Sequence, residues 1–133
     1  MNTTLLSEHE ALLSAARDVR ERAYAPYSKF TVGAALDTGD GAVFLGCNVE
    51  NASYGLTICA ERAAVSAAIA AGYRDFSAIA VAGPDDAITS PCGACRQVLA
   101  EFNPEMTVIF TTPHGPVTAT VTELLPHSFG PLV

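Results

Sequence analysis

The chain has 133 residues, of which 50% are hydrophobic, 7 are basic and 14 are acidic, and its formal net charge is −7. This length fits one domain over residues 1–133 with a sizeable core, and the acidic balance argues against nucleic acid or an anionic membrane as a partner. Four cysteines are too few for a disulfide-stapled miniprotein, and we see no signal peptide or membrane-spanning apolar run; we therefore expect a cytoplasmic protein whose clustered thiols bind metal or react.

Hydrophobic periodicity predicts alternating helices and strands. Apolar residues at helical spacing between Leu5 and Ala23 predict a first helix, which Pro26 ends. A hairpin follows, with strands over 30–36 and 42–47. A polar loop over 48–57 then leads into an alanine-rich helix over 59–71.

The second half of the chain continues the alternation. We expect Ser90 as the N-cap and Pro91 in the first turn of a helix that ends at Phe102. The other predicted elements are strands over 76–82, 106–111 and 117–121 and a short helix over 122–125. This order predicts an α/β fold in which helices cover a mixed sheet.

Three cysteines and one glutamate lie at the starts of two predicted helices. Cys59 precedes Glu61 by two residues, and Cys92 and Cys95 share the first turn of the later helix. Helix N-termini favour thiolates, and three thiolates can bind zinc while leaving its fourth position for water. A carboxylate beside that water can carry protons. Glu61 reaches the same site only if Cys59 lies at or before the first helical residue.

The residues alone leave three other interpretations open. In the first, Cys92 and Cys95 form a thioredoxin-like redox pair. In the second, Cys47 completes a closed, four-thiolate structural zinc site, although its place at the end of an apolar strand is more typical of a small core residue. In the third, Glu61 is an ordinary first-turn acid that the helix dipole favours.

Cys-x-Glu followed by Pro-Cys-x-x-Cys resembles the signature of the zinc deaminases. With the segments 27–30, 32–35, 46–57, 59–62 and 91–97, nearly the whole chain resembles the small homotetrameric cytidine deaminases. The resemblance implies a three-layer α/β/α fold with a mixed five-stranded sheet, and one zinc ion per subunit. It also implies hydrolytic deamination of cytidine and deoxycytidine to uridine and deoxyuridine in pyrimidine salvage, by a homotetramer with sites at subunit interfaces. A blasticidin-S-type deaminase and a Cys-x-x-Cys redox protein are the alternatives.

The same resemblance implies roles for individual residues. Cys59, Cys92 and Cys95 bind zinc, and Glu61 transfers protons. The substrate-binding residues are Phe30 against the pyrimidine, Asn48 and Glu50 at the ribose, Ala60 through its backbone, and Val49, Asn51, Ala52, Ser53, Tyr54 and Phe129, of which Tyr54 and Phe129 reach a neighbouring subunit.

Structural interpretations of three of these residues stay open. Phe30 on a strand is also typical of a core residue, and Asn48 and Asn51 are typical of residues that order a turn through side-chain to backbone bonds. Arg62 and Arg96 each follow a predicted ligand or proton-transfer residue. Three thiolates and one divalent ion carry a net negative charge, so we expect at least one of the two arginines to donate a hydrogen bond to a ligand sulfur.

Overall fold

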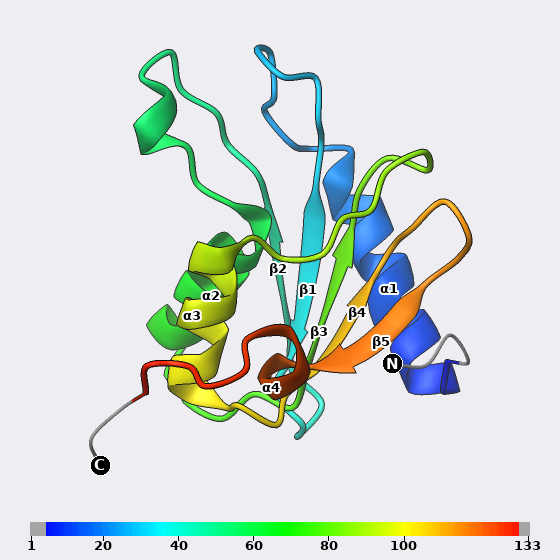
Figure 1. Ribbon diagram of the computed structural model, residues 1–133, viewed down its shortest axis with the longest axis vertical. Coiled ribbons are helices and arrows are strands. Elements are labelled where there is room, and N and C mark those ends of the chain that lie inside the picture. Colours follow the sequence, from blue (N-terminus) through cyan, green and yellow to red (C-terminus); the bar gives the residue numbers. More distant parts are fainter. Residues whose placement is uncertain (1–4, 131–133) are drawn as a thin grey trace.

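A computed structural model describes residues 5–130, and the chain follows the predicted order of elements (Figure 1). The helices are α1 (Ser7–Arg20), α2 (Ala60–Ala70), α3 (Gly93–Phe102) and α4 (Val121–Leu124), with a short 3₁₀ turn, η1, at Tyr54–Leu56. The strands are β1 (Gly33–Asp37), β2 (Val43–Cys47), β3 (Ala78–Ala82), β4 (Thr107–Phe110) and β5 (Val117–Thr120).

The strands form one mixed sheet in the order β2-β1-β3-β4-β5. β3 and β4 pair in parallel, and the other neighbours pair antiparallel. The parallel pair is joined by α3, as a crossover connection requires. The predicted mixed five-stranded sheet is confirmed.

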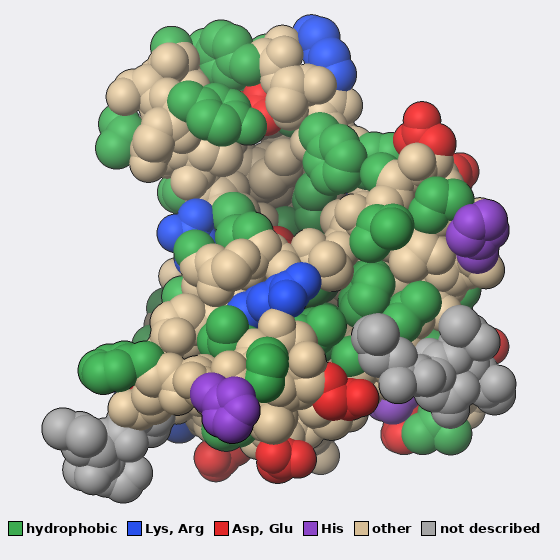
Figure 2. All heavy atoms as spheres, in the orientation of Figure 1, with side chains coloured by type: hydrophobic (Ala, Val, Ile, Leu, Met, Phe, Trp, Pro, Cys, Tyr) green, Lys and Arg blue, Asp and Glu red, His purple; other side chains and the backbone are tan. Residues whose placement is uncertain are grey.

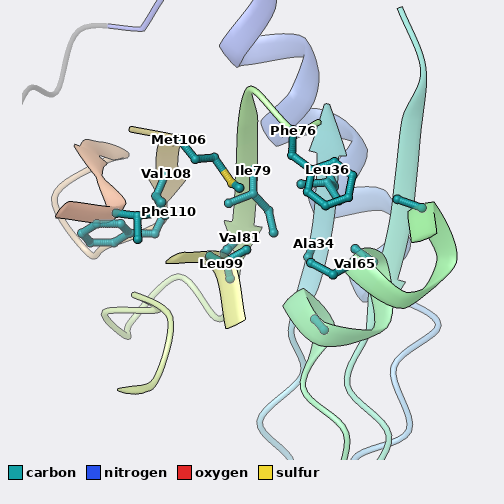
Figure 3. Packing of buried hydrophobic residues seen from close by; sticks show 14 of the residues in the cluster. Ala34, Leu36, Val65, Phe76, Ile79, Val81, Leu99, Met106, Val108 and Phe110 are labelled. Atoms are coloured by element: carbon teal, nitrogen blue, oxygen red, sulfur yellow. The ribbon is translucent and has the colours of Figure 1, made fainter. Parts of the chain in front are cut away.

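Helices cover both faces of this sheet. On β1, Ala35 points to a core shared with α1, whereas Ala34 and Leu36 point to the larger core under α2 and α3, because successive strand residues face opposite sides. Figure 3 shows this larger core, in which Ile79 and Val81 of β3 lie between Leu36 and the residues of β4. The three-layer α/β/α arrangement is confirmed.

Most element boundaries differ from the prediction by a few residues, and two of these differences have a cause in side-chain contacts. The first strand begins at Gly33 and not at Phe30, because the Asn48 side chain bonds the backbone of Phe30 and Val32. The third helix begins at Gly93 with Cys92 as its N-cap, and Ser90 is not the cap. The Ser90 hydroxyl instead accepts a hydrogen bond from the guanidinium of Arg96.

Two connections, over 21–32 and 48–59, project beyond one end of the sheet, at the top of Figure 1. An isolated bridge between Tyr24 and Val49 joins the two connections, and a second bridge, between Val49 and Ile58, lies within the connection 48–59. These connections form one wall of the candidate site. Over residues 5–130, no helix combines the length and apolar character needed to cross a bilayer.

Candidate metal centre and active site

The N-termini of α2 and α3 bring three sulfurs together. Cys59 and Cys92 are the N-caps of the two helices, both with extended backbone, and Cys95 lies in the first turn of α3. The three Sγ atoms all lie within 4.8 Å of one another. Because Cys59 is a cap and not a helical residue, the condition for Glu61 to reach the same site is met.

This donor set fits zinc. Tetrahedral zinc with Zn–S bonds of about 2.3 Å places its sulfurs about 3.8 Å apart, which the cluster accommodates with small side-chain adjustments. Thiolates are soft ligands that zinc accepts readily. Cys47, at the end of β2 and half-buried, is not in the three-sulfur cluster found among residues 5–130, so the closed four-thiolate interpretation has no support there.

Hydrogen bonds within the cluster favour a thiolate at Cys59. The Cys95 thiol is the largest influence and, together with Arg62, lowers the pKa of Cys59 to about 5. Nη2 of Arg62 lies 3.2 Å from Sγ of Cys59, which is the contact expected for one of the two arginines. The pKa of Cys95 is raised, because its proton is held by Cys59 and because the thiol is buried.

Arg96 does not make the contact expected at the ligand sulfurs. Its guanidinium donates to the carbonyl oxygens of Pro91 and Leu124, both at 2.7 Å, and to Oγ of Ser90 at 3.3 Å. Oxygen is a better acceptor than sulfur, so these three partners take the donors of the side chain. Arg96 therefore ties the segment before Cys92 to the end of α4.

Glu61 is buried beside the sulfurs, with 5% of its surface exposed. Burial raises the pKa of its carboxyl, its own backbone N–H acts in the opposite direction, and the charge of Cys59 raises it further. A carboxyl group that is buried next to a metal-binding cluster, and has a raised pKa, is typical of a residue that exchanges protons during a reaction.

A cavity of about 280 Å³ opens beside Cys59, Glu61 and Cys92 and extends to the projecting connections. Figure 2 shows this face of the molecule hollowed below the projecting lobe, with hydrophobic side chains beside the hollow. The cavity is at the small end of the range for small-molecule sites. Among the predicted substrate residues, those that line it are Phe30, Asn48, Glu50, Tyr54 and Ala60.

Six lining residues were not predicted individually: Ser28, Val32, Thr57, Ile88, Thr89 and Ser90. Ser28 lies inside the block 27–30 that carries the family resemblance, and 88–90 immediately precede the Pro-Cys-x-x-Cys motif. Nearness to these motifs was the only signal in the sequence that could have identified them.

The Asn48 side chain orders the entry to β1. Its Oδ1 accepts from the Val32 N–H at 2.9 Å, and its Nδ2 donates to the Phe30 carbonyl at 2.8 Å. The turn-ordering interpretation holds for Asn51, whose Oδ1 accepts from the Ser53 N–H at 2.9 Å, and not for Asn48, whose bonds reach residues 16 and 18 positions earlier in the chain. An amide nitrogen carries two hydrogens, so these bonds leave one of them for a ligand. Phe30 itself is 38% exposed and lines the cavity, so it is not a core residue.

The Glu50 carboxylate is held by the turn that precedes Phe30. Oε1 accepts from the backbone N–H groups of Tyr27 at 3.0 Å and Ser28 at 3.1 Å, and Oε2 accepts from the Ser28 hydroxyl. The Ser28 hydroxyl is the main cause of a lowered pKa of Glu50, against the opposing effect of burial. The carboxylate therefore stays ionised near neutral pH.

Five of the predicted substrate residues lie outside the cavity lining. Val49, Asn51, Ala52 and Ser53 are exposed on the projecting connection. Phe129 is 82% exposed, and its carbonyl accepts from Gln97 Nε2 at 2.6 Å. Tyr54 lines the cavity yet is 64% exposed. Contacts of these residues with a nucleoside stay predictions.

Comparison with known proteins agrees with this geometry. Residues 6–111 match the family model described as the cytidine and deoxycytidylate deaminase zinc-binding region. A cytidine deaminase of Sporosarcina psychrophila is 49% identical over 90% of this chain and 90% of its own length. A blasticidin-S deaminase of Bacillus cereus is 33% identical over 74% of this chain and 76% of its own.

A solved structure extends the likeness to the fold. The crystal structure of cytidine deaminase from Burkholderia pseudomallei has a TM-score of 0.87 and 54% sequence identity, and covers 91% of this chain and 98% of its own. Both the three-sulfur cluster and the match over 6–111 point to zinc as the metal. The chain therefore belongs to the cytidine and deoxycytidylate deaminase family.

Proposed function

We infer that this protein is a zinc-dependent deaminase that hydrolyses cytidine and deoxycytidine to uridine and deoxyuridine, with release of ammonia. The observation that carries this conclusion is the cluster of Cys59, Cys92 and Cys95 with buried Glu61 at the inner end of a small cavity. Zinc held by the three sulfurs supplies Lewis acidity, which makes water a nucleophile at neutral pH.

Glu61 is the residue that moves protons in this proposal. It accepts a proton from the water as oxygen attacks C4 of the pyrimidine, and passes it to ring N3. The proton of the new C4 hydroxyl then passes through Glu61 to the exocyclic nitrogen, the C4–N bond breaks, ammonia leaves, and the C4 oxygen becomes the carbonyl of uridine. Its burial next to Cys59 supports this assignment, because a proton carrier must lie within hydrogen-bond reach of the reacting atoms.

Charge balance gives Arg62 a part in the same proposal. Three thiolates around a divalent ion leave one net negative charge, which opposes deprotonation of water. The 3.2 Å bond from Arg62 to Cys59 and the positive ends of α2 and α3 draw some of that charge away from the metal.

The other residues that line the cavity suit the sugar and the base. We propose that the free hydrogen of Asn48 and a free lone pair of Glu50 bind ribose hydroxyls. Phe30, partly exposed at the cavity wall, packs on the pyrimidine, and the backbone of Ala60 at the start of α2 contacts the base. None of these contacts requires a phosphate group on the ligand, so together they suit a nucleoside.

We also propose a homotetramer whose sites lie at subunit interfaces. Large apolar side chains stay exposed on the projecting connections and near the C-terminal end, among them Tyr54 at 64%, Leu56 at 66% and Phe129 at 82%. Exposed clusters of this kind are typical of protein interfaces. Sedimentation or native mass spectrometry of the purified protein measures the assembly directly, and a monomer with full activity would contradict the interface proposal.

A place in pyrimidine salvage and a cytoplasmic location complete the proposal. Salvage follows from the proposed substrates, which are free nucleosides. A reducing compartment suits three closely spaced thiols, which an oxidising one would convert to disulfides.

The test is an ammonia-release assay over cytidine, deoxycytidine, cytosine and blasticidin S, together with zinc analysis. We expect turnover of the two nucleosides and one zinc ion per chain. Turnover of blasticidin S alone would favour the alternative within the deaminases. A zinc-free protein with a reducible Cys92–Cys95 disulfide would favour the redox alternative.

A further inference from the structure

One hydroxyl group joins the two ends of the predicted nucleoside site. Oγ of Ser28 donates to Oε2 of Glu50 and accepts from the backbone N–H of Phe30 at 3.0 Å. Ser28 also lines the cavity. The carboxylate at the sugar end and the aromatic ring at the base end are thus connected through a single side chain.

The backbone around Ser28 is fixed in an uncommon shape. Lys29 has a φ of 63°, in the left-handed region that residues other than glycine rarely adopt. Its N–H donates to the Ala25 carbonyl at 3.0 Å, which closes the turn. Such a conformation persists where the surrounding contacts fix it, and here the contacts to Glu50 do so. Phe30 leaves this turn directly toward the cavity.

The bonds to Glu50 leave one acceptor position open. A carboxylate has about four lone-pair positions, and Glu50, which is 4% exposed, uses two on Oε1 and one on Oε2. The open position therefore belongs to Oε2, the oxygen that the Ser28 hydroxyl holds. A ligand hydroxyl at this end of the cavity would donate to that oxygen.

We propose that Ser28 is a positioning residue for sugar recognition. Its hydroxyl orients Oε2 of Glu50 toward a substrate hydroxyl and fixes the position of the carboxylate relative to Phe30. This inference rests on the proposed function. It predicts that loss of the Ser28 hydroxyl weakens binding of the sugar hydroxyls and leaves contacts with the base nearly unchanged, because the Asn48 side chain also holds the backbone of Phe30.

The experiment measures inhibition constants of uridine and 2′,3′-dideoxyuridine against cytidine turnover. For S28A we expect the constant for uridine to rise about tenfold, the size expected when one hydrogen bond to a charged group is lost, and that for the dideoxy ligand to change less than about twofold. S28T keeps the hydroxyl and should restore uridine binding. S14A makes the same change at an exposed position of α1 and should match the wild type.

A general structural defect would weaken both ligands equally, and that result would overturn the inference, as would unchanged uridine binding in S28A. If S28A does not fold, S28C keeps the side-chain size with a poor donor and should show the same selective loss. A wild-type protein without activity on cytidine would instead refute the proposed function, so the two failures can be told apart.

Discussion

Replacing Gly46 by alanine perturbs the position of the metal ligands from a distance. Gly46 lies on β2 where α2 crosses it, and α2 has Cys59 as its N-cap and Glu61 in its first turn. A Cβ added at Gly46 would lie 2.4 Å from the carbonyl oxygen of Ala60 and 2.5 Å from the nitrogen of Ala64. Both are backbone atoms of a helix, so no side-chain rotation relieves the contact.

The expected effect follows from that overlap. Ordinary contact distances for carbon begin near 3.5 Å, so the start of α2 must retreat by about 1 Å. Overpacking of this kind costs about 1–3 kcal/mol of stability. A misplacement of about 1 Å at a catalytic group costs on the order of 10²-fold in rate. We therefore expect G46A to fold, to be less stable, and to lose about 10²-fold in kcat/KM with weaker zinc retention.

The assay combines urea unfolding, zinc retention against a chelator, and cytidine turnover. The matched control is G33A, whose Cβ would lie 2.0 Å from the Ala16 carbonyl oxygen and so displaces α1, on the other face of the sheet. G33A should lose stability while the folded protein keeps its zinc. Equal zinc retention and equal turnover in G46A and G33A would refute the claim that this close approach positions the ligands.

Four further outcomes follow from the site. E61Q should keep zinc and bind nucleoside but lose about 10²–10⁴-fold in kcat, and normal turnover would remove Glu61 as the proton carrier. R62Q should keep zinc and turn over more slowly, because the bond to a ligand sulfur is lost; unchanged kcat would exclude Arg62 from the charge balance. C47A should retain its full zinc content, and a loss of metal would revive the four-thiolate interpretation. Ser28 is the main cause of the lowered pKa of Glu50, so the wild type should be more stable than S28A above the ordinary pKa of 4.5. This difference in stability should disappear as the pH falls through the lowered pKa of Glu50. Unfolding curves of both proteins at pH 7 and at about pH 3 check this.

The sequence pattern was sufficient for the order of elements because each carries a local signal. The short apolar run along Gly33–Asp37 and the alanine-rich composition of Ala60–Ala70 are properties of neighbouring residues, and the sheet with helices on both faces follows from the order of such segments. The predicted N-cap of α3, Ser90, was wrong by two residues. Cys92 is the N-cap, and the Ser90 hydroxyl accepts a hydrogen bond from Arg96. The single domain over residues 1–133 stays a prediction.

Some contacts of the candidate site could likewise be predicted from local sequence, and others could not. The three cysteines are close in space because two helix starts face one another, and the motif spacing predicts that arrangement. The partners of Arg96 lie as far away as Leu124, and periodicity contains no information about a contact of that range. The hydrogen bond from Ser28 to Glu50 likewise depends on the left-handed backbone of Lys29. No glycine stands at that position, so the sequence does not indicate this conformation.

The metal end and the proposed sugar end of the cavity are therefore held by different kinds of contact, so substitutions at the two ends should have different effects. The metal end rests on helices packed against the sheet, where Gly46 permits the close approach of α2, and we expect a shift there to change zinc binding and kcat together. The sugar end rests on hydrogen bonds between two projecting connections that have no sheet beneath them. Substitutions there should act mainly on KM. Apolar side chains such as Tyr27 and Tyr54 stay exposed on those connections, so the proposed association of subunits should stabilise the sugar end more than the metal end.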